Sequence, residues 1–210
     1  IGGGTPTTLE PDQLRRLLGA ITEYFPCEEL EEFTVEAGRP DSITLEKLQA
    51  IREFPVTRIS VNPQTMNQKT LDVIGRKHTV EEIKEAYALA RKTGFDNINM
   101  DIIAGLPGED ISDMEDTLAQ IAQMHPDSLT VHSLAIKRAA RMEMEDLNRD
   151  AKETHEILSG MIERAAKAAK EMIFSRIICT DRRILRGILK MLGMQRLTKP
   201  EYTIYLLWKK

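Results

Sequence analysis

The stretch Asn97-Ile-Asn-Met-Asp-Ile-Ile-Ala-Gly-Leu-Pro-Gly108 decides the fold class. Its apolar run up to Ala104 predicts a buried strand, and the glycines and proline that follow predict the turn that ends it. Ser112-Asp-Met-Glu115 then has the spacing of a capping box, which predicts a helix running to about Met124. A buried strand followed by a helix is the unit from which parallel sheets are built, so this stretch indicates an α/β protein.

The same alternation recurs on both sides of this stretch. Three more strands are predicted, at Glu32–Glu36, Arg58–Asn62 and Ser128–Leu134. Helices are predicted at Pro11–Tyr24, at Leu45–Arg52, after the capping box Thr79-Val-Glu-Glu82, and from about Arg149 to Met172. Strands joined through helices imply right-handed crossovers and a parallel sheet. We therefore predict an α/β barrel or partial barrel, with a doubly wound open sheet as the alternative.

Composition excludes several classes of function. The 210 residues are 41% apolar and 30% charged with a net charge of −4, so nothing overall indicates a nucleic-acid or acidic-membrane partner. No apolar run approaches about 18 residues, so no transmembrane helix is expected. Cys27 and Cys179 lie too far apart to suggest a disulfide framework or a metal cluster. We predict a cytoplasmic protein.

The charge is distributed unevenly along the chain. Residues 173–210 carry nine Lys or Arg and two acids, a net charge of +7, which leaves −11 for residues 1–172. We therefore divide the chain into a body, residues 1–172, and a basic tail, residues 173–210.

Polar side chains gather where the predicted strands end. Glu36 ends the first strand, Ser60, Asn62 and Gln64 end the second, and Asp101 and His132 lie within the last two. The carboxyl ends of parallel strands form the binding face of such sheets, so these residues are candidates for a site. Each also has a structural alternative. Asp101 could pair with a nearby arginine or backbone amides, Glu36 could form a local contact, and His132 could simply be packed.

The chain begins with a glycine-rich loop, Gly2-Gly-Gly-Thr-Pro-Thr7, where a bare backbone lets a ligand approach closely. Such a loop normally follows a strand, yet only Ile1 precedes it. We expect the sequence to be a piece of a longer protein, and we expect the piece alone to be poorly soluble because a sheet edge would be unpaired.

Taken together, these segments resemble the radical S-adenosylmethionine (SAM) enzymes, and among them the oxygen-independent coproporphyrinogen III oxidase family and its coproporphyrinogen dehydrogenase-like branch. The resemblance covers about residues 1–172. The motifs that carry it are Gly2–Thr7, Thr34-Val-Glu-Ala-Gly38, Arg58-Ile-Ser-Val-Asn-Pro-Gln64, Ile74-Gly-Arg-Lys-His-Thr79, Asn99–Gly108 and His132-Ser-Leu-Ala-Ile-Lys137.

The resemblance implies a partial (β/α) barrel, here truncated at its N-terminus, that holds SAM and a [4Fe–4S] cluster. It implies a tetrapyrrole substrate and radical chemistry, in which the 5′-deoxyadenosyl radical abstracts hydrogen and two propionates become vinyl groups with loss of carbon dioxide. It leaves the electron donor unidentified.

The resemblance also implies roles for individual residues. Gly3 and Gly4, with Thr5, would cradle the amino and carboxylate groups of the SAM methionyl moiety, and Glu36 would bind its ammonium. Arg76 would pair with its carboxylate. Gln64 and Asp101 would form hydrogen bonds to SAM, Asp101 to the ribose hydroxyls, and backbone at Gly105 would pass close to the cofactor.

Two features depart from the family pattern. The cluster-binding motif Cys-x3-Cys-x2-Cys is absent and would lie upstream of Gly2, so we expect no cluster and no catalysis by the chain as given. The tail also lacks the family's aromatic-rich stretch. Codons can be chosen for residues 177–183 so that another frame encodes Tyr-Tyr-Leu-Tyr-Arg-Gln-Lys, so we hypothesise that the residues from about Ile173 onward are an out-of-frame translation. The alternative is a basic amphipathic helix at Arg182–Leu192.

Three other functions stay open from the sequence. A haem-binding chaperone would keep the same barrel without oxidase activity. A radical SAM enzyme with another substrate would keep the SAM residues. A plain α/β binding module would use neither.

Overall fold

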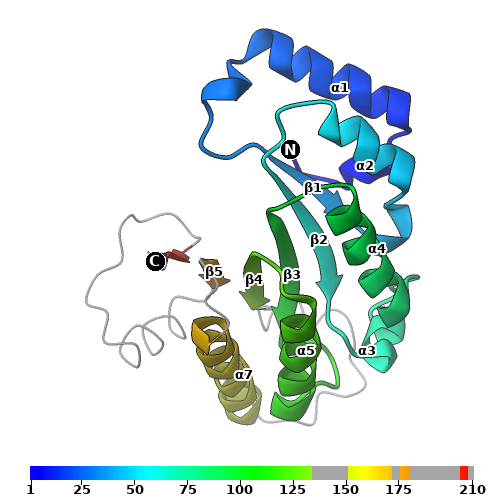
Figure 1. Ribbon diagram of the computed structural model, residues 1–210. Helices are drawn as coiled ribbons and strands as arrows, with labels where there is room; N and C mark the ends of the chain where they lie inside the picture. The colour runs from blue at the N-terminus through cyan, green and yellow to red at the C-terminus, as the bar shows by residue number, and fades with distance from the viewer. Residues whose placement is uncertain (134–150, 172–175, 180–203, 208–210) are drawn as a thin grey trace. The chain divides into compact units, whose positions relative to one another are not determined.

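The computed structural model describes residues 1–133, 151–171, 176–179 and 204–207 (Figure 1). The chain forms two compact units. The first comprises Ile1–Pro63 and Lys77–Met100, and the second comprises Gln64–Arg76 and Asp101–Lys210. Two of the unit boundaries fall within strands, between Pro63 and Gln64 and between Met100 and Asp101, so the polar residues of these strands are divided between the units.

Four strands form one sheet in the order β1-β2-β3-β4, and their bounds are Thr34–Gly38, Arg58–Gln64, Ile98–Ala104 and Ser128–Ser133. The parallel register of β1 and β2 places Val35 opposite Ile59 and Glu36 opposite Ser60, and it shifts between Glu36 and Gly38. Nearly all of β2 and β3 is buried, as expected for strands covered on both faces. The predicted α/β class with a parallel sheet is confirmed.

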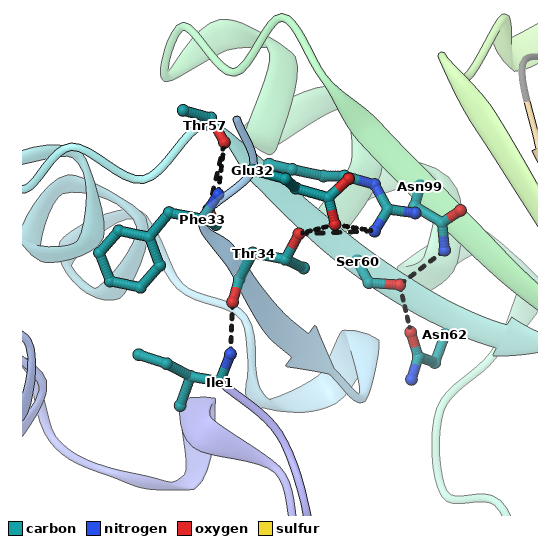
Figure 2. Close-up of polar contacts among 9 residues, drawn as sticks. Ile1, Glu32, Phe33, Thr34, Thr57, Ser60, Asn62 and Asn99 are labelled. Atoms are coloured by element: carbon teal, nitrogen blue, oxygen red, sulfur yellow. Dashed lines mark hydrogen bonds and ion pairs between the residues drawn. The ribbon is translucent and has the colours of Figure 1, made fainter. Parts of the chain in front are cut away.

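β1 begins two residues later than the predicted strand. The Phe33 backbone N–H donates to Thr57 Oγ1 at 2.8 Å, while its carbonyl accepts from the Thr57 and Arg58 backbone N–H groups (Figure 2). A side chain thus takes the place of a ladder partner at Phe33, and regular pairing starts at Thr34.

The first unit places its helices around β1 and β2. These elements are η1 (Pro6–Thr8), α1 (Pro11–Tyr24), η2 (Cys27–Glu29), η3 (Pro40–Ser42), α2 (Leu45–Arg52) and α4 (Val80–Lys92). α1 packs on α2, and α2 on α4. The predicted capping box of α4 is confirmed, because Thr79 N donates to Glu82 Oε2 at 2.7 Å and Glu82 N donates to Thr79 Oγ1 at 3.2 Å.

The second unit contains α3 (Gln68–Val73), α5 (Ile111–Met124), α7 (Ala151–Glu171), β5 (Arg176–Cys179) and β6 (Ile204–Leu207). α5 and α7 lie side by side (Figure 1). Gly160 of α7 faces Ile111 so closely that a Cβ at this glycine would lie 2.5 Å from Ile111 Cδ1. The glycine therefore leaves room for the Ile111 side chain between the two helices.

The capping box predicted at Ser112 and Glu115 is wrong. α5 begins one residue before Ser112, at Ile111, and its N-cap is Asp110. The Asp110 carboxylate accepts from the backbone N–H groups of Ser112 and Asp113, and the Asp113 carboxylate accepts from the Asp110 N–H at 2.9 Å. Asp ranks with Ser as an N-cap residue, so the local sequence offered two starts, and the earlier one is used.

Part of the basic tail is described. β5 and β6 pair antiparallel, with Arg176 opposite Leu207 and Cys179 opposite Ile204. The alternative helix at Arg182–Leu192 lies outside the described residues, and the division at residue 172 stays a prediction. Within the described ranges, no helix is both long and apolar enough to cross a bilayer.

Candidate cofactor-binding site

The glycine-rich loop leaves the sheet beside β1. The Ile1 nitrogen donates to the Thr34 carbonyl, and the Glu36 N–H donates to the Ile1 carbonyl at 3.0 Å, so Ile1 pairs with β1 as a neighbouring strand would (Figure 2). The chain then turns away at Gly3, whose φ of 93° is unfavourable for residues with a Cβ. A Cβ at Gly2 would lie 2.6 Å from the Glu36 carboxylate. Glycine therefore permits the loop to approach this acid.

Hydrogen bonds hold the C-terminal end of this loop, at Thr7, to neighbouring segments of the first unit. Buried Thr7 donates through Oγ1 to the Ala37 carbonyl, and it shares a 2.6 Å hydrogen bond with Ser42 Oγ. Lys47 Nζ donates to the Thr7 carbonyl at 2.7 Å. Gly38 adopts φ 71°, and a Cβ there would lie 2.7 Å from Thr5 Cγ2. Thr5 is consequently held against the carboxyl end of β1.

Glu36 is the acid that this loop borders. Its side chain is half-buried at the end of β1, and within the described residues its carboxylate has neither a hydrogen bond nor an ion pair. A half-buried carboxylate without a partner loses solvation and gains no contact in exchange. It is therefore available to bind a cationic group of a ligand.

A row of polar side chains crosses from β3 to β2 in the first unit. Asn99 Nδ2 donates to Ser60 Oγ at 2.9 Å, and Ser60 Oγ donates to Asn62 Oδ1 at 3.0 Å (Figure 2). These bonds occupy the Asn62 oxygen and leave its Nδ2 group as a donor toward a ligand. The sequence indicated Ser60 and Asn62. For Asn99, the only indication in the sequence was its spacing of two residues from Asp101, which places both side chains on the same face of the strand.

The second unit contributes the other predicted site residues. Gln64 ends β2 with φ 71°, and its side chain, 9% exposed, makes no hydrogen bond within the described part of the chain. Asp101 in β3 lies 3.9 Å from His132 in β4, measured from Oδ2 to Nε2. Gly105 has φ 85°, and its N–H donates to the Met161 sulfur at 3.2 Å. Arg76 follows α3 and is half-buried.

The candidate residues thus form two groups. Gly3, Gly4, Thr5 and Glu36 belong to the first unit, where the structure brings the glycine loop and Glu36 together. The second group belongs to the second unit and consists of Gln64, Arg76, Asp101 and Gly105. In this unit His132 lies close to Asp101. The binding roles assigned to these residues stay predictions.

Metal ligands are not grouped in the described residues. No three His, Cys, Asp or Glu side chains among them are placed to hold a metal ion, and Cys27 is a buried free thiol. The described part of the chain therefore does not supply the thiolate set that an iron–sulfur cluster requires.

Comparison with known proteins identifies the class. Residues 1–121 match the model of the radical SAM superfamily, which is more than half of the chain. The chain therefore belongs to the radical SAM superfamily.

Three known proteins are similar to the chain. The chain is 47% identical over 142 residues to the oxygen-independent coproporphyrinogen-III oxidase-like protein HemZ of Bacillus subtilis, covering 67% of this chain and 28% of HemZ. It is 36% identical over 138 residues to the heme chaperone HemW of the same organism, covering 65% and 36%. The structure of coproporphyrinogen III oxidase HemN from Escherichia coli matches with a TM-score of 0.68 and 26% identity, covering 83% and 40%. The chain spans less than half the length of each relative.

The structural match confirms the predicted partial barrel of radical SAM type. Membership of the superfamily implies SAM and a [4Fe–4S] cluster as cofactors. The residues present fit SAM, because a carboxylate without a partner lies against a bare glycine backbone, and this suits an ammonium group carried by an extended moiety.

Proposed function

We propose that this chain forms the SAM-binding part of a radical SAM oxidoreductase of the coproporphyrinogen III oxidase type. The observation that carries the proposal is the Glu36 carboxylate, which has no partner among the described residues and lies so close to the loop that a Cβ at Gly2 would be 2.6 Å from it. The 47% identity to the oxidase-like protein HemZ supports the choice of a tetrapyrrole substrate.

Each candidate residue has a role in this proposal. Glu36 binds the methionyl ammonium of SAM through charge-assisted hydrogen bonds, and the backbone at Gly3 and Gly4, with Thr5, holds the same moiety. Arg76 pairs with the methionyl carboxylate through its two-pronged guanidinium. Gln64 binds SAM by hydrogen bonds.

The remaining residues act on the nucleoside. Asp101 accepts hydrogen bonds from the ribose hydroxyls, and Gly105 lets the backbone approach the cofactor. When bound, SAM together with a reduced cluster would supply the abstraction of a hydrogen atom from a propionate side chain, and loss of carbon dioxide together with transfer of one electron to an acceptor would leave a vinyl group.

Isothermal titration of the 210-residue chain with SAM tests the binding role. Glu36→Gln should weaken SAM binding about tenfold or more, because a hydrogen bond to a charged group is lost. Glu85→Gln, at an exposed position on α4, is the matched control and should bind like the wild type. Absence of SAM binding by the wild type, or equal affinity of Glu36→Gln, would contradict the proposal.

A haem chaperone is the second candidate, favoured by the 36% identity to HemW. The two functions share the SAM residues and differ in what happens to the tetrapyrrole. The protein as its gene encodes it should be reconstituted anaerobically with iron and sulfide and given coproporphyrinogen or haem. Turnover of coproporphyrinogen supports the oxidase, whereas stoichiometric haem binding without turnover supports the chaperone.

A further inference from the structure

A buried acid in the second unit lies outside the residues considered so far. Glu109 follows the Gly-Leu-Pro-Gly turn after β3, and it is only 4% exposed. Thr65, which follows β2 and is 1% exposed, donates through Oγ1 to Glu109 Oε1 at 2.7 Å. Thr65 Oγ1 also lies 3.2 Å from Oγ1 of buried Thr117 in α5. Burial raises the pKa of Glu109, and the hydrogen bonds from Thr65 and Thr70 oppose that rise.

The same threonines fix the backbone that follows β2. The Met66 N–H donates to Thr117 Oγ1 at 3.1 Å, and Gln120 Nε2 donates to the Met66 carbonyl at 3.2 Å. Asn67 Nδ2 donates to Asp113 Oδ1 at 2.9 Å. Side chains on or just before α5 therefore hold the segment from Thr65 to Asn67 along its whole length.

This fixed segment begins directly after a strained residue. Gln64 has φ 71°, a left-handed conformation that is unfavourable for any residue with a Cβ, so surrounding contacts must impose it. Its own side chain forms no hydrogen bond within the described residues, so the amide does not hold the backbone in place. The bonds made by Thr65, next in the chain, are the nearest side-chain restraint.

We propose that Glu109 is a positioning residue for SAM, which acts through Thr65 to keep Gln64 in its left-handed conformation and its amide free for the cofactor. This inference rests on the proposed function, since it assigns Gln64 to SAM. Glu109 itself does not touch the cofactor in this proposal.

The test is SAM affinity of the 210-residue chain, measured by isothermal titration on samples shown by thermal melting to be folded. Glu109→Leu removes the acceptor and should weaken SAM binding about tenfold, because the buried Thr65 hydroxyl loses its hydrogen-bond partner. Glu109→Gln keeps an oxygen that accepts from Thr65 and should stay within about twofold of the wild type. Thr65→Val should behave like Glu109→Leu, and Thr65→Ser like the wild type.

Repeating the measurement in a Gln64→Gly variant separates a positioning role of Glu109 from a general effect of Glu109 on stability. Gln64→Gly removes the amide whose placement is at issue. In that background Glu109→Leu should cause no further loss of SAM affinity, whereas a purely structural role predicts the same fold-loss in both backgrounds. Where Glu109→Leu does not fold, Thr65→Val and Thr65→Ser complete the same cycle.

The outcomes distinguish this inference from the proposed function. A wild-type chain that binds SAM while Glu109→Leu and Thr65→Val bind it equally well overturns the inference alone. An undiminished loss in the Gln64→Gly background also overturns it alone. A wild-type chain that does not bind SAM overturns the proposed function and this inference together.

Discussion

The two loops that carry candidate site residues accommodate a positive φ angle in opposite ways. The loop Gly2–Thr7 uses glycine where φ is positive, and the hydroxyl of its anchor, Thr7, bonds only to neutral oxygens. The loop Gln64–Asn67 places a residue with a full side chain at φ 71° and anchors it to a buried carboxylate. In the first loop, glycine has no Cβ, so a positive φ causes no strain. In the second loop, the Cβ of Gln64 causes strain, and a network of hydrogen bonds has to offset it. The second loop should therefore respond more strongly to loss of a single hydroxyl.

The largest effect is expected where glycine itself is replaced. Gly38→Ala adds a Cβ 2.7 Å from Thr5 Cγ2 at φ 71°, and it should destabilise the protein by about 3 kcal/mol. Gly19→Ala is the matched control, because its Cβ meets only Phe54 at 3.7 Å within α1, and it should stabilise by about 0.5–1 kcal/mol. Urea unfolding measures both. Equal effects of the two substitutions would show that the contact of Thr5 with the end of β1 does not depend on glycine at position 38.

The direct comparison between the loops is Thr65→Val against Thr7→Val. Both hydroxyls are buried, but Thr65 donates to a carboxylate and Thr7 to a carbonyl. Thr65→Val should lower the free energy of unfolding by about 2 kcal/mol and Thr7→Val by about 1 kcal/mol, because bonds to charged groups contribute more. A larger loss for Thr7→Val, measured by the same denaturant series, would reverse the comparison.

The smallest effect is a change in pH dependence. Burial raises the pKa of Glu109 above its ordinary value of 4.5, so the folded state resists ionisation of this group. The stability that the neutral acid contributes is fully present below pH 4.5 and is lost as pH rises through the folded-state pKa. Glu109→Gln does not ionise, so its stability relative to the wild type should increase over that range. A difference between the two proteins that stays constant with pH would contradict the raised pKa.

Sequence patterns located elements that depend on local contacts. Apolar spacing gave the bounds of α1 and α2 as the structure has them, because each helix presents its own buried stripe. The start of β1 was wrong because a side chain 24 residues away replaces a ladder bond. α3 was missed because its six residues are too few to show a helical period.

The candidate site was predictable to a similar degree. The glycine loop and Glu36 were visible as a motif and meet in the structure. The left-handed backbone of Gln64 and the buried state of Glu109 were not, because the Thr65–Glu109 bond joins residues 44 apart in the chain. Glutamate after a turn is ordinarily solvated, so nothing local marks it as interior.

The contact between Gly160 and Ile111 has a consequence for comparing chains. A residue with a Cβ at position 160 would lie 2.5 Å from Ile111 Cδ1, so either the Ile111 side chain would have to adopt another rotamer or α7 would have to move along α5. Positions 160 and 111 therefore share one limited space between the two helices. A homologous sequence with a bulky side chain at position 160 should carry a smaller residue at position 111, or show another rotamer there, or show α7 shifted against α5, so these two aligned columns should be compared together.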